Sequence, residues 1–192
     1  MSELGKLEKD CMLCRSCELC KTRKNVVFGE GKKDAEVLFV GEGPGSSEDE
    51  IGLPFVGRAG KLLDTMLELI DLDRSKIYIT NMVKCRPPEN RDPLPAEKDL
   101  CNIWLAEQIR IINPKIIVCL GRIAAMRFLG KDFKISRDHG KFYEQDGVLI
   151  TALYHPAALL RDPRRRPETF SDLKALKAEI LRVCNSTYKE VN

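Results

Sequence analysis

The chain has 192 residues, a length that suits one domain with a sizeable hydrophobic core and allows two domains only if both are small. Its formal net charge of +3 is modest and argues neither for nor against a nucleic-acid partner. No apolar run approaches the roughly 20 residues that a membrane-spanning helix needs, so we expect a soluble protein that does not bind membranes.

The chain begins with MSELGKLEKD, which is charged and lacks the apolar core of a signal peptide. We therefore expect a cytoplasmic, reducing setting, in which clustered thiols are metal ligands more often than disulfides. The first cluster holds four cysteines at an unbroken spacing of three: Cys11, Cys14, Cys17 and Cys20. We treat residues 1–192 as a single domain with a cysteine-rich N-terminal arm over about 1–25.

After the arm, short apolar runs alternate with helical patterns. Four β-branched runs predict buried strands: 36–41, 77–80, 115–121 and 148–153. Segments with helical periodicity predict four helices: Lys61 to Ile70, Ala96 to Ile112, Arg122 to Leu129 and roughly Pro167 to Cys184. This alternation favours an α/β fold in which a mostly parallel sheet is covered by helices on both faces.

The carboxyl ends of these strands carry the unusual motifs. The four runs end, in chain order, at these residues: Gly41-Glu42-Gly43-Pro44-Gly45, Asn81, Gly121, and Tyr154-His155-Pro156. Ligands of parallel sheets bind beyond the carboxyl ends of the strands, because loops and helix N-termini converge there. This edge is therefore the default candidate for an active site.

The first of these motifs, GEGPGSSEDE at 41–50, places three glycines and a proline directly after a strand. Glycines let a ligand approach the backbone closely, and amides in such a loop can point at an anion or a carbonyl oxygen. The alternative is a purely structural tight turn. The motif is neither GxGxxG nor a Walker loop, which argues against binding of nucleotide phosphates.

Three side chains near this edge have both a structural and a functional interpretation. Asn81 caps a turn or offers its carboxamide to the Watson–Crick edge of a pyrimidine. Phe55 in GLPFVG is a core residue or stacks on a planar ligand. His155 is one of two histidines and lies in a strand-end loop that Pro156 fixes, and here we favour a functional role.

The segment RDPRRRP at 161–167 concentrates arginines between prolines: Arg161, Arg164, Arg165 and Arg166. We expect a loop rather than a regular helix. Composition does not choose between a solvated charged loop and a clamp on phosphates.

Two further cysteines join the arm as candidate metal ligands, because Cys85 follows the second strand and Cys101 lies in the next helix. Six thiols then compete for the four positions of a cubane cluster, and the spacing fits neither a two-knuckle zinc ribbon nor the ferredoxin run. Cys119 and Cys184 lie within a strand and near a helix end, where we expect small buried apolar residues.

Four motifs together carry a family resemblance: GEGPG with Glu48 and GLPFVG, Asn81 with KCRPPENR, and YHPAALLR. From about Cys14 to its last helix, the chain resembles the family 4 uracil-DNA glycosylases, the iron–sulfur branch of that superfamily. The resemblance implies a three-layer α/β/α sandwich with a central four-stranded parallel sheet. It also implies base-excision repair of DNA, by hydrolysis of the N-glycosidic bond of uracil to leave an abasic site.

The resemblance further implies a 4Fe-4S cluster with ligands in a CxxC pair, in the KCRPP motif and in the next helix. Counting back from the VVFGEG segment places the ligands on Cys14, Cys17, Cys85 and Cys101. Cys11 and Cys20 are then spare, although a ladder of period three also allows a shift by one step. We expect a structural cluster that orders an arm with few apolar anchors.

For the substrate, the resemblance implies that uracil is flipped out of the DNA. Phe55 would lie against the flipped ring, and Asn81 would bind its O4 and N3 edge. Cytosine reverses that donor and acceptor pattern and would be rejected. The wall formed from Gly45 to Glu48 would exclude the C5 methyl group of thymine.

For the chemistry, His155 would donate to uracil O2 and stabilise the departing anion, assisted by backbone amides around Glu42 and Gly43. Family 1 enzymes have an aspartate at the position of Gly43. A general base would therefore have to be Glu42 or Glu48, or electrostatic stabilisation would carry most of the catalysis. Of these two carboxylates we favour Glu42.

The segment AALLRDPRRR at 157–166 would face the DNA. Leu159 or Leu160 would fill the vacated stack as a wedge, and phosphates would be bound by arginines: Arg161, Arg164 and Arg165. We expect a monomer that acts on uracil-containing DNA, single- or double-stranded, and the sequence identifies no sliding-clamp or other repair partner. Two alternatives are a non-enzymatic iron–sulfur protein that binds nucleic acid or transfers electrons, and a zinc-stabilised hydrolase of free nucleotides.

Overall fold

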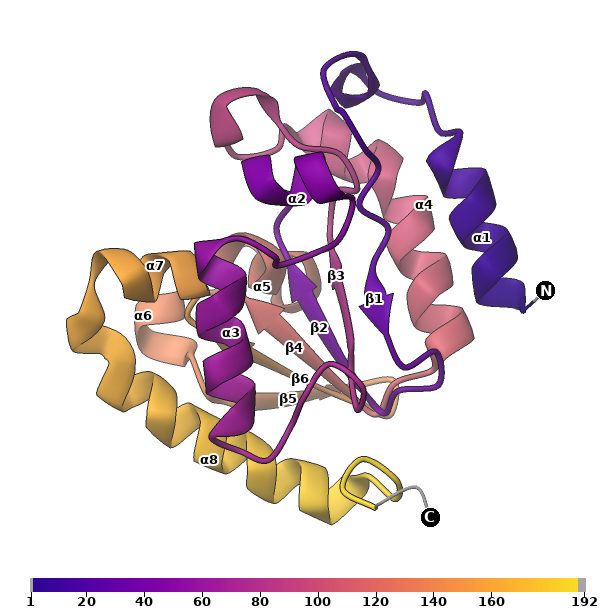
Figure 1. Cartoon of the computed structure of the whole chain (residues 1–192). Helices are drawn as coiled ribbons and strands as arrows, with labels where there is room; N and C mark the ends of the chain where they lie inside the picture. The colour runs from indigo at the N-terminus through magenta and orange to yellow at the C-terminus, as the bar shows by residue number, and fades with distance from the viewer. Residues whose placement is uncertain (1, 190–192) are drawn as a thin grey trace.

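A computed structural model describes residues 2–189 (Figure 1). Within this range the sheet has six strands in the order β1-β3-β2-β4-β6-β5. Its central strands are parallel to one another: β3 (Tyr78–Asn81), β2 (Val37–Gly41), β4 (Ile116–Leu120) and β6 (Val148–Leu153). They match the four predicted strands to within one residue at each end, so the parallel sheet inferred from the sequence is confirmed.

The two edge strands, β1 (Glu30–Gly31) and β5 (Phe142–Gln145), pair antiparallel with their neighbours. The sequence analysis did not predict them. β1 has two residues, and both edge strands are at least partly exposed along their whole length, so neither has the buried apolar run that marks a central strand. The sheet is therefore mixed, with a parallel centre.

Alternating side chains of each central strand feed two separate cores. In β2, Leu38 and Val40 pack on one face of the sheet, whereas Val37 and Phe39 pack on the other. The first face is covered by α1 (Glu3–Met12), α4 (Pro95–Ile112) and α5 (Arg122–Leu129). The second is covered by α3 (Arg58–Glu68), α7 (Pro156–Arg161) and α8 (Arg166–Val183). This arrangement confirms the three-layer α/β/α sandwich.

The remaining elements are short. They are α2 (Ser46–Ile51), α6 (Ile135–Asp138) and three 3₁₀ helices, η1 (Glu18–Lys21), η2 (Pro88–Asn90) and η3 (Pro163–Arg165). The proline-rich arginine segment is only partly the loop that its composition predicts, because Arg161 ends α7 and Arg166 begins α8. None of the helices in the described part of the chain is long and apolar enough to span a bilayer.

The arm contains a helix that the sequence analysis did not predict. Helix α1 begins after Ser2, whose hydroxyl accepts a hydrogen bond from the Gly5 amide at 3.2 Å. Its buried residues Leu4 and Cys11 belong to the core that includes Leu105 of α4. These two side chains are the buried residues of the helix, which packs against α4 as Figure 1 shows.

Candidate active site

A cavity of about 570 Å³ opens at the carboxyl edge of the parallel strands. The loops that follow β2, β3, β4 and β6 all contribute to its wall. Every predicted catalytic and substrate-binding residue lines it: Glu42, Gly43, Gly45, Glu48, Phe55, Asn81 and His155. Residues far apart in the sequence thus meet at one site, as strand-end convergence requires.

Asn81 is the last residue of β3 and is 1% exposed. Its Oδ1 is buried and has no hydrogen-bond partner within the described residues. The neighbouring strand leaves room for it only because residue 41 is glycine. A Cβ at Gly41 would lie 2.3 Å from Asn81 Oδ1 and 2.6 Å from the Phe55 ring. An unpaired buried amide beside a cavity is costly unless a ligand completes its hydrogen bonds.

Phe55 is held in a left-handed conformation, with φ of 53°, that few aromatic residues adopt. Arg74 fixes it by donating from Nη1 to the Pro54 carbonyl at 2.9 Å and from Nη2 to the Phe55 carbonyl. A Cβ at Gly60 would overlap the same Phe55 carbonyl at 1.7 Å, so only glycine fits there. The Phe55 ring centroid lies 5.7 Å from that of His155. The aromatic wall of the cavity is therefore rigidly positioned.

His155 is the N-cap of α7, and its Nδ1 accepts a hydrogen bond from the Ala157 amide at 3.1 Å. A neutral ring in this position carries its proton on Nε2. Burial lowers the pKa of His155 to about 4, the charge of Arg161 adds to this effect, and Glu48 opposes it. At neutral pH the site therefore contains an uncharged imidazole with one N–H donor.

Glu48 is fully occupied by backbone amides. Its Oε1 accepts from Val56 at 2.9 Å and Gly57 at 2.8 Å, and its Oε2 accepts from Gly45 at 3.1 Å. The carboxylate thus ties the glycine loop to the segment that carries Phe55. With its two oxygens engaged, Glu48 is better suited to positioning these loops than to removing a proton.

Glu42 is the other carboxylate that the sequence left as a candidate base, and none of the described residues donates a side-chain hydrogen bond to it. Burial raises the pKa of Glu42 to about 7, and the charge of Asp92 adds to this effect, while Arg122 and Lys98 oppose it. A carboxylate with such a pKa is suited to accept a proton near neutral pH. A Cβ at the neighbouring Gly43 would lie 2.7 Å from Val83 Cγ2, so a side chain there requires Val83 to shift.

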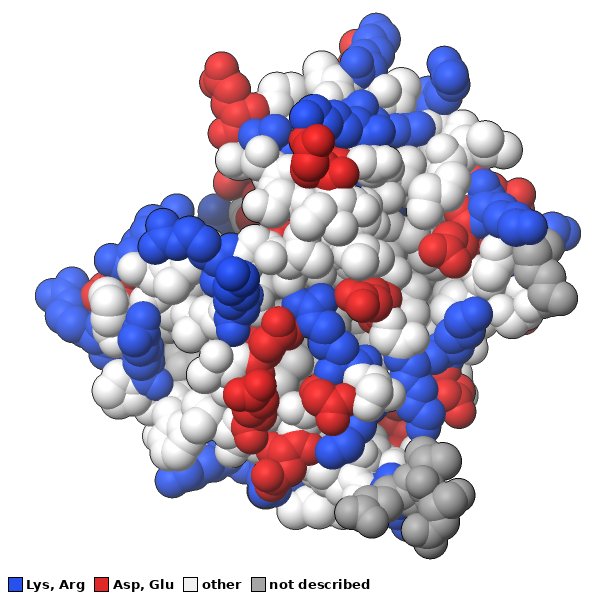
Figure 2. Space-filling view, viewed as in Figure 1, with Lys and Arg blue, Asp and Glu red and all other residues white. Residues whose placement is uncertain are grey.

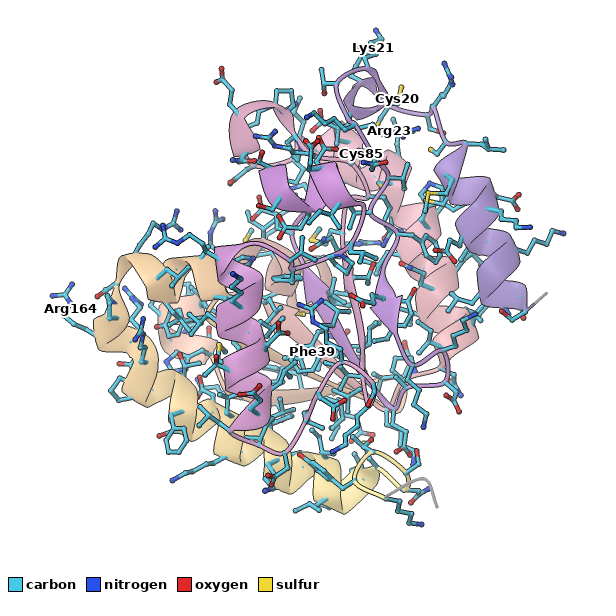
Figure 3. All side chains as sticks on the ribbon, in the orientation of Figure 1. Cys20, Lys21, Arg23, Phe39, Cys85 and Arg164 are labelled. Carbon is cyan, nitrogen blue, oxygen red and sulfur yellow. The ribbon has the colours of Figure 1, made fainter. Side chains whose placement is uncertain are left out.

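The predicted DNA-facing residues differ in their exposure and in their contacts. Leu159 is 1% exposed within the core, so it is not available as a wedge, whereas Leu160 is partly exposed. Arg161 lines the cavity. Arg164 points outward and pairs with Asp162, with its Nε 2.8 Å from Oδ1 (Figure 3). Figure 2 shows basic side chains gathered over this corner, at the left of the view.

Arg165 differs from its neighbours because it packs against the fold. Its Nη1 donates to the Tyr154 hydroxyl at 2.8 Å, and its guanidinium lies 4.9 Å from the Tyr154 ring centre. It also forms an ion pair with Asp162 at 3.2 Å. The structure therefore favours an internal role for Arg165 over a contact with DNA.

Several residues of the cavity wall were given no individual role from the sequence, although Pro87, Asn90 and Arg91 belong to the KCRPPENR motif. The others are Asp92, Arg122 and Ile123. Pro87 to Asp92 follow β3, and Arg122 begins the helix after β4. The same rule of strand-end convergence that identified Asn81 and Gly121 would have found them.

A second, smaller cavity between the arm and α4 collects thiols. Its wall includes six cysteines: Cys11, Cys14, Cys17, Cys20, Cys85 and Cys101. Cys119 and Cys184 do not line it. Nitrogen donors face the sulfur atoms, since Arg23 Nη1 donates to Cys85 Sγ at 3.1 Å and the Lys84 amide donates to Cys101 Sγ at 3.3 Å. Figure 3 shows Cys20, Arg23 and Cys85 following one another from the arm toward α4.

The thiols of this cavity are the donor type of iron–sulfur clusters. Over residues 2–189, no three His, Cys, Asp or Glu side chains lie close enough to hold one metal ion. A four-iron cluster bonds each thiolate to a different iron, so its ligands lie farther apart than those of a tetrahedral zinc site. The adjacent cations Arg23 and Lys84 suit the negative charge of a thiolate-bound cluster.

Lys84 links the two cavities. Its side chain is 1% exposed, and its Nζ donates to the Asn81 carbonyl at 2.8 Å, to Thr80 Oγ1 at 2.7 Å and to Gln108 Oε1 at 2.5 Å. The next residue is Cys85. The end of β3 is therefore held by the same segment that lines the thiol cavity.

Comparison with known proteins places this geometry in a family. The model of the uracil DNA glycosylase superfamily matches residues 28–180. A type-4 uracil-DNA glycosylase of Archaeoglobus fulgidus is 48% identical over 185 residues, 92% of each chain. Type-4 enzymes of Sulfurisphaera tokodaii and Thermotoga maritima are 43% and 46% identical, over 92% and 78% of this chain and 84% and 79% of their own. With four parallel strands, one cavity at their carboxyl edge and these relatives over most of its length, the chain belongs to the uracil DNA glycosylase superfamily and to its type-4 family.

Proposed function

We propose that this protein is a DNA-repair enzyme that hydrolyses the N-glycosidic bond of uracil in DNA and leaves an abasic site. The observation that carries the proposal is Asn81, a buried amide with an unpaired oxygen, in one cavity with His155 and Phe55. The type-4 uracil-DNA glycosylases at 42% to 48% identity support the same activity. The proposed working unit is a single chain acting on uracil in single- or double-stranded DNA.

Recognition of uracil follows from hydrogen-bond chemistry at Asn81. The amide nitrogen donates to uracil O4, and the unpaired Oδ1 accepts from N3–H. Cytosine presents a donor and an acceptor in the reverse order, which leaves buried groups unpaired at a cost of about 1–3 kcal/mol for each. Phe55 stacks on the ring and, with the Gly45 to Glu48 wall, limits the space around it.

The chemical step divides between two residues. As the bond between C1′ and N1 breaks, its electrons pass to uracil, and negative charge develops on O2. The neutral His155 donates its Nε2–H to that oxygen, an interaction that strengthens as the charge grows. Water attacks C1′ and loses its proton to Glu42, and the uracil anion leaves and takes a proton from solvent. Glu48 acts as a positioning residue for both loops.

We further propose that Cys14, Cys17, Cys85 and Cys101 hold a 4Fe-4S cluster. When bound, the cluster supplies a covalent cross-link between the arm, the segment after β3 and α4. Arg23 supports the site by donating from Nη2 to the Cys14 carbonyl at 2.7 Å as well as to Cys85. No step of the proposed hydrolysis passes through the iron.

On the DNA side, Leu160 is the proposed wedge, because Leu159 belongs to the core. Arg161 at the cavity rim and the outward Arg164 are the proposed phosphate ligands. An Arg164→Ala change should weaken binding to all sequences alike and reduce its salt dependence, which is the behaviour of a phosphate contact.

The test is excision from labelled oligonucleotides that carry uracil, thymine or hypoxanthine, followed by cleavage of abasic sites. We expect excision of uracil and not of thymine. Asn81→Asp and His155→Ala should each lower the single-turnover rate by roughly 100-fold or more, as loss of a preorganised donor does. Unchanged excision in both variants would instead favour a non-enzymatic iron–sulfur protein.

A further inference from the structure

The thiol cavity contains two more cysteines than a four-iron cluster binds. Four of the six come from the arm, where they repeat every third residue: Cys11, Cys14, Cys17 and Cys20. This ladder contains three overlapping CxxC pairs: 11 with 14, 14 with 17, and 17 with 20. Any one of these pairs has the spacing that the proposed cluster uses at its arm side.

The outer members of the ladder already lie at the cavity. Cys11 is 0% exposed at the end of α1, and Cys20 lies in η1 with partial exposure. Backbone hydrogen bonds make the ladder compact, because the Cys14 amide donates to the Cys11 carbonyl at 3.0 Å and the Cys20 amide to the Cys17 carbonyl at 3.2 Å. Both outer thiols therefore line the same cavity as the inner pair.

The opposite wall has no such reserve. Cys85 and Cys101 are the contributions of the β3 segment and α4, and the two remaining cysteines of the chain are elsewhere. Cys119 is buried within β4, and Cys184 follows α8. The two sides of the cavity therefore differ in how many thiols they can lose.

We propose that Cys11 and Cys20 are reserve ligands, so that the arm can bind the cluster through any of its three CxxC pairs. If Cys14 is lost, Cys17 and Cys20 remain as a pair. If Cys17 is lost, Cys11 and Cys14 remain. The incoming thiol gives its proton to solvent as its sulfur bonds to iron, so the exchange needs no oxidant or reductant. This inference rests on the proposed cluster.

Single substitutions give the first test, with iron and sulfide per chain and visible absorbance measured on anaerobically purified protein. Cys14→Ala and Cys17→Ala should each retain iron within roughly twofold of the wild type, because a CxxC pair survives. Cys85→Ala and Cys101→Ala should retain less than about a tenth of the iron, because no other thiol replaces them. Cys119→Ala, outside the cavity, is the control.

Matched double substitutions separate a reserve pair from a mere excess of thiols. Replacing both Cys11 and Cys20 by alanine leaves the central pair, Cys14 and Cys17, and should leave the iron content unchanged. Replacing both Cys14 and Cys20 by alanine, or both Cys11 and Cys17, also removes two thiols but leaves no CxxC pair. Both of these variants should lose the cluster. All three double variants keep two arm cysteines, and they differ in the spacing of those two cysteines along the chain.

The outcomes distinguish this proposal from the cluster itself. A wild-type protein without iron would overturn both. A wild type with iron, but Cys14→Ala or Cys17→Ala without it, would overturn the reserve ligands alone, whether the variant folds without iron or does not fold. Loss of iron in the variant that lacks both Cys11 and Cys20 would show that an outer cysteine is a primary ligand and would also overturn the proposal.

Discussion

Gly41 is important for the site because it has no side chain. It lies opposite Asn81 in the paired strands β2 and β3, and the space that a Cβ would occupy there is already filled by Asn81 and Phe55. Any side chain there competes with the Asn81 amide and the Phe55 ring for the same space. Gly43, two residues later, is also crowded, but its nearest neighbour is the tip of the Val83 side chain.

Gly41→Ala should therefore damage the site more than Gly43→Ala. A displacement of Asn81 by about 1 Å is expected to lower the single-turnover excision rate by roughly 100-fold. Gly43→Ala should have a smaller effect, because Val83 can move. Single-turnover rates and melting temperatures of both variants measure this, and equal rates for the two would contradict the assigned geometry.

The proposed role of Glu42 predicts a pH dependence. Because its pKa is raised to about 7, Glu42 is mostly protonated below that pH and cannot accept a proton from water. The single-turnover rate should rise with pH through about 7 and then level off. His155, with a pKa of about 4, should contribute no inflection in the same range.

Glu42→Gln is the corresponding variant. It should be slower at pH 8, and its rate should no longer rise through pH 7, because the titrating group is gone. Glu48→Gln is the matched control for a carboxylate that binds backbone amides, and it should keep the pH dependence while lowering the rate. A Glu42→Gln profile with the wild-type inflection would assign the base elsewhere.

At the level of elements, one carboxylate joins the start of β2 to the segment after α8. Glu36 accepts hydrogen bonds from the amides of Asn185 and Ser186, each at 2.7 Å, and of Thr187 at 3.0 Å. Lys115 lies 3.0 Å from it. Although burial opposes it, this set of donors holds the pKa of Glu36 well below its ordinary value of 4.5.

Glu36→Gln should lower the free energy of unfolding at pH 7 by about 1–3 kcal/mol. Since the folded-state pKa lies below the unfolded one, the stabilisation is complete above pH 4.5 and is lost as the pH falls. Wild type and variant should therefore converge in acid. Denaturant titrations from pH 3 to pH 7 measure this, with Glu18→Gln, in an exposed ion pair, as a control expected to change little.

Elements also explain what the sequence could and could not reveal. The four central strands were predictable because each is a continuous apolar run, and the long helices were predictable because each carries an apolar period. Leu159 was misplaced because its burial depends on AALLR being a helix, a signal present in Pro156 at the first helical position. Arg165 was assigned to DNA phosphates because its contact with Tyr154 could not be read from the sequence: Tyr154 lies on another element, and the contact depends on how both are packed.

On the scale of the whole molecule, the proposed cluster would join the arm to the rest of the fold. Cys85→Ala should remove the iron and lower the melting temperature by about 5–10 °C, as a loss of a few kcal/mol does at this size. Excision at low temperature should remain close to the wild-type rate, because the cluster takes no part in the reaction. Cys184→Ala is the control. A normal melting temperature without iron would contradict a structural role.

Three residues lie between Asn81 and Cys85, and the last of them, Lys84, binds the Asn81 carbonyl through its ammonium group. This short segment therefore joins the proposed uracil-binding amide, Asn81, to a proposed ligand of the iron–sulfur cluster, Cys85. Loss of the proposed cluster to an oxidant would therefore reach Asn81 only through lower thermal stability, so excision should fall at high temperature before it falls at low temperature. An inserted residue between Asn81 and Cys85 should remove this link between the cluster site and the uracil-binding amide.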